Sequence, residues 1–267
     1  MSRILALLRK EILDLRQSPT VFLAAALTGL FSIAIPFFVA VLVPYFTGEL
    51  LSDSSDFAIA IEMYKSQPEF RGLDPEAAIQ AWIFQTFLIF MIITPVAGAM
   101  SIAAYSVVGE KQARTLEPLL ATPISTIELL GAKVLGALLP ALLLTVVYYA
   151  LYVAGVAVAA RPGAYRVLLG PRSLAVVFLL GPLTSLLALQ LAVCVSSRVN
   201  DPRTAQQVGA LVILPVTGLM LAQLFGVLQL TIAFTAILAV ALVAINAVLL
   251  WAASVLFARE VILTRWR

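Results

Sequence analysis

The chain has 267 residues, of which 62% are hydrophobic and only 12% charged, with a mean hydropathy of +1.06. Soluble domains carry roughly 25% charged residues, so this composition excludes a soluble enzyme or binding domain and indicates a polytopic membrane protein. The single cysteine, Cys194, excludes a disulfide framework, and the absence of histidine removes the commonest metal ligand. The formal net charge is +3, but no stripe of basic residues indicates nucleic-acid binding.

Residues 1–17 predict an amphipathic helix that lies at the membrane surface. Apolar residues recur on one helical face, whereas basic and acidic residues occupy the remainder. These charges are too many for the apolar core of a cleavable signal peptide. An ordinary solvated helix would need a soluble core to pack on, and the composition leaves no room for one.

Six apolar segments follow, each near the roughly 20 residues that a helix needs to cross a bilayer. They cover residues 20–46, 78–108, 129–159, 174–195, 208–227 and 232–257. Residues 226–231 form either a tight external turn or a re-entrant stretch, because the apolar run is hardly interrupted there. The expected fold class is therefore an all-α membrane protein with an interfacial N-terminal helix and six transmembrane helices.

The distribution of basic residues predicts that both termini lie in the cytoplasm. With six spans and the N-terminus inside, 12 of the 17 Lys and Arg residues fall in inner segments and the other five in outer loops. This is the bias of the positive-inside rule. The longest extracytoplasmic loop is then 47–77, whose mixed charges either keep it solvated or attract a cation or a partner. We expect a multi-pass protein of a bacterial or archaeal inner membrane.

No charged residue needs to lie deep in a predicted span. Proton-coupled and ion-coupled transporters usually place acids or bases at depth, and intramembrane proteases need buried acids or a histidine pair. The sequence therefore predicts neither a catalytic residue nor a metal site in this chain. Energy is expected to come from another subunit.

A polar insert at residues 109–125 separates the second and third predicted spans. Thr115 can cap a short helix, and Pro123 ends it. Ser125 and Glu128 then form a capping box that starts the third span. Periodicity alone leaves two interpretations open: the short helix docks another protein, or it rests on lipid headgroups.

The insert resembles the signature of permease subunits of type-2 ABC exporters. In that family a Glu-Lys/Arg pair precedes Gly-Thr-Leu-Glu-Leu-Leu, a Thr-Pro-Ile/Val-Ser turn, and then Glu and Gly-x-Lys. Arg114 departs from the pattern, since glycine is common at that position. The inner loop 196–207 also resembles the corresponding loop of the family. The matching residues are Glu110, Lys111, Thr115, Leu116, Glu117, Leu119, Leu120, Thr122, Pro123, Ser125, Glu128, Gly131 and Lys133.

The resemblance implies a type-2 ABC exporter permease fold and a half-transporter that moves an unknown substrate by alternating access. A separate cytoplasmic ABC ATPase would hold ATP and Mg²⁺, because this chain has no Gly-x-x-x-x-Gly-Lys-Ser/Thr phosphate loop. A second copy, or a similar chain, would complete the complex in the lipid bilayer. The alternative is a membrane component of an ABC-type complex for assembly, cofactor maturation or signalling, without small-solute transport.

In the family, the insert is the coupling helix, which docks the ATPase. The implied docking residues are Glu110, Lys111, Arg114, Thr115, Leu116, Glu117, Leu119, Leu120, Thr122 and Pro123. The second inner loop, which also resembles the family's, supplies the further site candidates Arg198, Asp201 and Arg203.

Polar residues within the predicted spans have two possible roles. A polar side chain at depth either bonds a neighbouring helix, at about 0.6 kcal/mol on average, or lines a transport pathway. The pathway candidates are Gln85, Tyr149, Gln190 and Asn246. Small residues such as Gly29 would let helices approach closely at an interface between two copies.

Overall fold

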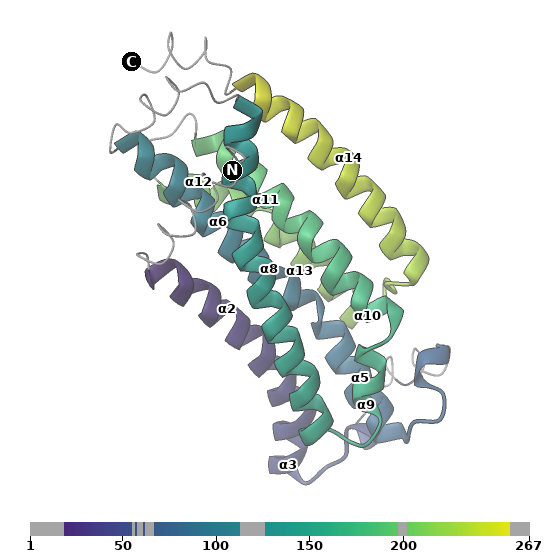
Figure 1. Cartoon of the computed structure of the whole chain (residues 1–267). Helices are drawn as coiled ribbons and strands as arrows, with labels where there is room; N and C mark the ends of the chain where they lie inside the picture. Colours follow the sequence, from purple (N-terminus) through teal and green to yellow (C-terminus); the bar gives the residue numbers. More distant parts are fainter. Residues whose placement is uncertain are drawn as a thin grey trace.

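The computed structural model describes residues 19–54, 57, 61, 67–112, 126–196 and 202–256, and this part of the chain contains helices but no strand (Figure 1). The predicted interfacial helix at 1–17 lies outside the described residues. The α-helices are α2 (Pro19–Phe37), α3 (Val43–Thr47), α5 (Pro75–Phe87), α6 (Ile89–Gln112), α8 (Thr126–Ala159), α9 (Ala164–Leu168), α10 (Pro171–Ala175), α11 (Gly181–Ser196), α12 (Pro202–Ala210), α13 (Ile213–Leu224) and α14 (Ile232–Leu256).

Within the part of the chain that the structure describes, six helical stretches are long and apolar enough to cross a membrane. This confirms the predicted all-α class with six spans and supports a multi-pass membrane protein. The stretches are Ala26–Thr47, Pro75–Met100, Gly131–Ala159, Pro171–Val195, Gln206–Leu224 and Ile232–Ala253.

The helices run side by side and define two ends of the bundle (Figure 1). At one end α6 finishes at Gln112 and α8 begins at Thr126, beside the start of α12; we call it the insert end. Helices α3 and α9 lie at the opposite end, which we call the loop end.

Two spans contain a five-residue π-helical turn shortly before a proline. These turns, Phe38–Leu42 and Val176–Leu180, precede Pro44 and Pro182. A proline has no N–H, and its ring clashes with the carbonyl four residues earlier, so a wider turn relieves the helix. Pro44 leaves the carbonyl of Ala40 without its helical donor, and Nε2 of Gln80 donates to that oxygen at 3.1 Å.

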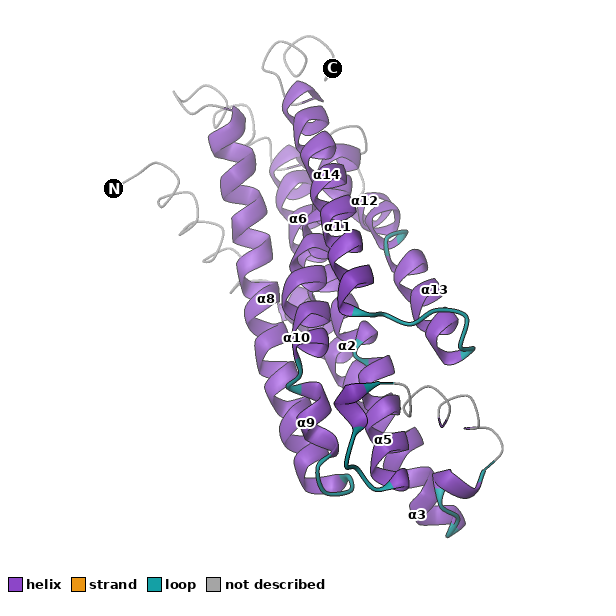
Figure 2. Cartoon of the chain, turned by 90° about the vertical axis from the view of Figure 1, so that its right-hand side faces the viewer, coloured by secondary structure: helices purple, strands orange, loops and turns teal. Residues whose placement is uncertain are grey.

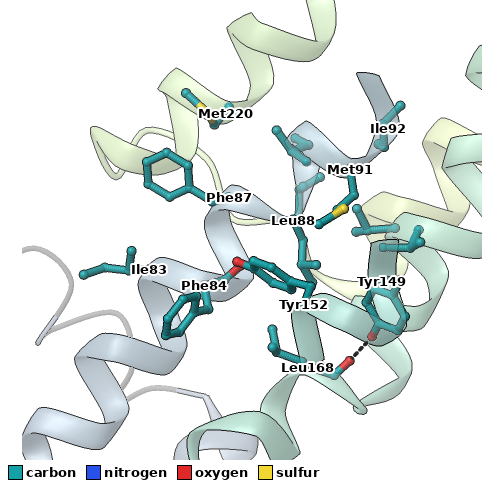
Figure 3. Close-up of a cluster of buried hydrophobic side chains, with 14 of the residues drawn as sticks. Ile83, Phe84, Phe87, Leu88, Met91, Ile92, Tyr149, Tyr152, Leu168 and Met220 are labelled. Carbon is teal, nitrogen blue, oxygen red and sulfur yellow. Dashed lines mark hydrogen bonds between the residues drawn. The ribbon is translucent and has the colours of Figure 1, made fainter. Parts of the chain in front are cut away.

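The centre of the bundle is the span that α5 and α6 form together. Nearly all residues of the stretch Pro75–Met100 are buried, whereas most residues of Ile232–Ala253 are not. The helix breaks at Leu88, whose N–H bonds the carbonyl of Gln85 instead of that of Phe84. The hydroxyl of Tyr152 donates to the freed Phe84 carbonyl at 2.9 Å, within the buried cluster of Figure 3. A side chain from α8 thus stabilises the break in the central helix.

Glycines allow α2 and α8 to approach each other closely. A methyl carbon at Gly29 would lie 2.4 Å from Cε2 of Tyr148, and one at Gly155 would lie 2.8 Å from Cζ of Phe37. The ring of Phe37 continues into an aromatic cluster with Phe84, at 5.0 Å between centroids. Gly29 therefore packs against its own chain, and the space beside it is already filled by Tyr148.

Candidate functional site

The insert lies between two helices that extend into the bundle. Helix α6 carries Glu110 and Lys111 in its last turn, and α8 continues from Thr126 for 34 residues. Helix α6 packs most extensively against α11, α8 and α2. A displacement of the insert would therefore reach the core of the bundle through two continuous helices. The predicted docking residues from Arg114 to Pro123 lie outside the described residues.

The second inner loop leads into α12 at the same end of the bundle. Arg203 lies in the first turn of α12 with its side chain exposed, whereas Arg198 and Asp201 lie outside the described residues. Gly209 lets α12 pack closely, because a methyl carbon there would lie 2.5 Å from Sδ of Met100 and 3.1 Å from the carbonyl oxygen of Ala188. Helix α12 is thus fixed onto α6 and α11.

The charged residues within the six span-length stretches are Glu76, Lys133 and Arg172, each in the first turn of its stretch. Their side chains are buried, with exposed fractions of 4%, 4% and 9%. This agrees with the expectation that no charge lies at mid-span. Arg172 nevertheless differs from its predicted place in an outer loop, because α10 begins at Pro171 and includes it.

Arg172 belongs to a group of polar side chains that meet on the loop-end side of the bundle. Its Nη1 donates to Oε1 of Gln67 at 2.5 Å, and its Nη2 donates to Oε1 of Gln223 at 3.4 Å. Nε2 of Gln67 donates in turn to Oε1 of Gln229 at 3.4 Å. Glu69, Gln85 and Ser173 complete this group, which we call the loop-end cluster: Gln67, Glu69, Gln85, Arg172, Ser173, Gln223 and Gln229.

Gln85 is the second centre of the loop-end cluster. Its Nε2 donates to Oε2 of Glu69 at 2.9 Å and to Oγ of Ser173 at 3.2 Å. Ser173 donates to the carbonyl of Val167 at 2.9 Å. Glu69 also attracts the guanidinium of Arg172 by its opposite charge. The cluster therefore joins the loop before α5 to α5, α10 and α13.

The predicted pathway candidates separate into two pairs. Gln85 and Tyr149 both hold the α9–α10 segment, because the Tyr149 hydroxyl donates to the carbonyl of Leu168. Asn246 of α14 donates through Nδ2 to the carbonyl of Leu183 in α11 at 3.0 Å. Oε1 of Gln190 and Oδ1 of Asn246 are buried, and neither accepts a hydrogen bond from the described residues. Gln85 and Tyr149 thus tie α5 and α8 to the α9–α10 segment, and Asn246 ties α14 to α11.

Glu76 differs from the expectation that charges of the 47–77 loop are solvated. Its carboxylate is buried and accepts hydrogen bonds from the N–H groups of Leu51 and Ser52, at 3.3 and 3.0 Å. The sequence contains one signal for this, since a carboxylate in the first turn of a helix is favoured by the helix dipole. Arg172 carries no comparable signal, because its partners Gln67 and Gln223 are 105 and 51 residues away.

Comparison with known proteins agrees with the resemblance that the insert predicted. The family model described as "ABC-2 family transporter protein" matches residues 52–240, which is more than half of the chain. No curated protein and no solved structure matches the chain. The matched range includes the insert, the loop-end cluster and the central span of the bundle. The chain therefore belongs to the ABC-2 transporter family, as a membrane subunit.

Proposed function

We propose that this chain is the permease subunit of an ATP-driven export complex, and that residues 109–125 dock a separate cytoplasmic ABC ATPase. The observation that carries the proposal is the course of α6 and α8, which extend from the two ends of the insert into the bundle. A polar insert on such helices suits a part that receives force from another protein. The exposed Arg203 at the start of α12 offers a second contact at the same end.

ATP and Mg²⁺ would be bound by the partner, which would move the insert during its hydrolytic cycle. Helix α6 would carry that movement into the bundle, since it packs against α11 and α2 and continues the central span. The break at Leu88, whose N–H bonds the carbonyl of Gln85, is the position at which α5 and α6 would change their relative direction. Such movement would open the membrane part alternately toward its two sides.

A second membrane half would complete the pathway. The interior of this bundle is filled by side chains such as Phe84 and Met91, which are fully buried. Large apolar side chains are exposed on several helices, including Phe31 on α2, Leu143 on α8 and Val240 on α14. Lipid would cover part of this surface, and a second copy or a similar chain would cover the rest.

The docking proposal predicts that Leu119→Asp abolishes co-purification of the ATPase subunit. Leu119 is expected to fill an apolar groove, and such an anchor contributes about 2 kcal/mol or more, so its loss weakens binding at least roughly 30-fold. The measurement is the amount of ATPase recovered with the affinity-tagged permease.

Val227→Asp is the matched control, because Val227 is 80% exposed in the turn after α13. This control should retain the ATPase at full yield, and both variants should insert in the membrane as the parent chain does. Full recovery of the ATPase with Leu119→Asp would show that the docking site lies elsewhere.

A further inference from the structure

Helix α13 runs along the margin of the bundle and is joined to α12 by a break (Figure 2). At the break, the N–H groups of Leu211, Val212 and Leu214 bond carbonyls three residues earlier. Most residues of the stretch Gln206–Leu224 are not buried. Because Gly209 fixes α12 against α6 and α11, residues 211–212 are positioned to act as a pivot for α13.

The opposite end of α13 is held by the loop-end cluster through long hydrogen bonds. Arg172 reaches Gln223 at 3.4 Å, and Gln67 reaches Gln229 at 3.4 Å. Protein N–H···O bonds are commonly near 2.9 Å, so these two are weak. The bond of Gln85 to Glu69, at 2.9 Å, does not involve α13 and is of ordinary length. The cluster thus has a firmly bonded side and a side that can separate.

The turn after α13 is attached to that helix. The N–H of Phe225 bonds the carbonyl of Leu221 at 2.9 Å, and those of Val227 and Leu228 bond the carbonyl of Ala222 at 2.9 and 3.1 Å. The teal loop of Figure 2 then returns to α14. A movement of α13 would therefore carry the first part of this turn with it.

We infer that α13 is a movable gate at the loop end, which we call the door. It pivots at residues 211–212 and is held closed by the hydrogen bonds of Arg172 and Gln67, which we call the latch. The inference rests on the proposed function, because the ATPase would supply the energy that opens the door. Arg172 suits a latch: when it releases Gln223, it keeps Gln67 and the attraction of Glu69, so opening does not leave a buried charge without a partner.

The inner face of the door explains why it stays closed at rest. Met220 of α13 is buried in the apolar cluster with Phe87 of α5 (Figure 3). Val216 of α13 is a buried member of the same cluster. Opening would separate these packed side chains and admit water between them, which is unfavourable unless a transported molecule or the energy of ATP compensates. The door should therefore open during the ATPase cycle.

The test is a distance measurement between spin labels in the complete complex in lipid nanodiscs. Arg71→Cys and Val227→Cys, in a Cys194→Ser background, report on the door without altering the loop-end cluster, because both positions are exposed. Labelled chains are diluted with an excess of cysteine-free chain. Helix α13 is about 18 Å long, so a pivot of roughly 20° moves its far end by about 6 Å.

We expect the distance from residue 71 to residue 227 to lengthen by about 6 Å when ATP and vanadate trap the complex. The control pair Arg71→Cys and Arg166→Cys joins two exposed positions that lie outside the door, and its distance should stay constant. An unchanged distance from 71 to 227 in a complex that hydrolyses ATP would overturn the door and leave the proposed function intact. Failure of the ATPase to bind would instead contradict the proposed function.

A second measurement tests the latch without the ATPase. Gln223→Leu removes one of the two long bonds, so the distribution of distances from 71 to 227 should broaden in the purified chain. Gln207→Leu, at an exposed position of α12, should leave it unchanged. A distribution that is identical in Gln223→Leu and the parent chain would show that α13 is not held by the latch.

Discussion

Gln80 bonds two backbone groups that have no helical partner. Its Nε2 donates to the carbonyl of Ala40, and its Oε1 accepts from the N–H of Arg161 at 2.8 Å. The first group is free because of Pro44, and the second lies just beyond the end of α8. One amide in the central span therefore holds two neighbouring spans at the loop end.

The residue-scale prediction is that Gln80→Leu lowers stability, although leucine is the more apolar side chain. A buried group left without its hydrogen bond costs about 1–3 kcal/mol, and two groups lose a partner here. Thermal unfolding in detergent should show a clearly lower midpoint than for the parent chain.

The matched control for that experiment is Gln207→Leu on the exposed face of α12, which should unfold at the parent temperature. Equal midpoints for Gln80→Leu and Gln207→Leu would show that the two backbone groups find other partners.

At the scale of elements, the contact of α2 with α8 depends on the absence of side chains at two positions. Gly29 accepts the ring of Tyr148, and Gly155 accepts that of Phe37. Each glycine faces a large aromatic residue of the other helix. This complementarity explains why the two helices meet along the same line.

We predict opposite effects for two glycine-to-alanine substitutions in helices. Gly29→Ala should destabilise the chain, because the new methyl would lie 2.4 Å from the Tyr148 ring. Gly218→Ala meets nothing within 4 Å and should stabilise α13 by up to about 1 kcal/mol through helix propensity. Unfolding midpoints of the two variants check this, and a destabilised Gly218→Ala would contradict it.

Run length and hydropathy predicted the six spans, because a lipid environment leaves few alternatives to apolar helices of this length. The breaks within the spans were less predictable. Pro44 and Pro182 signal the π-helical turns, and Pro215, four residues after Leu211, signals the break between α12 and α13. No proline marks the break at Leu88. The contacts of Arg172 with Gln67 and Gln223 were not predicted, because tertiary packing brings these residues together and no local sequence pattern indicates it.

At the scale of the whole molecule, the orientation in the membrane stays a prediction. The basic residues place the insert end in the cytoplasm and the loop end outside. Single cysteines at Ser54 and Gln112, in a Cys194→Ser background, should react with impermeant thiol reagents from opposite sides of sealed vesicles. Reaction of both from one side would contradict the six-span topology with cytoplasmic termini.

The contrast between buried and exposed spans has a consequence for how the chain is made. The stretch Ile232–Ala253 has a mean hydropathy of 2.6, so its own side chains are apolar enough for it to insert into the bilayer without other spans. Pro75–Met100 has a mean hydropathy of 1.9 and carries the polar residues Glu76, Gln80 and Gln85. Ser173, which binds Gln85, is 88 residues further along. At 5–20 residues per second the ribosome needs roughly 4 to 18 seconds to reach it. During biogenesis the polar side chains of the central helix must therefore remain without some of their hydrogen-bond partners until the later spans are made.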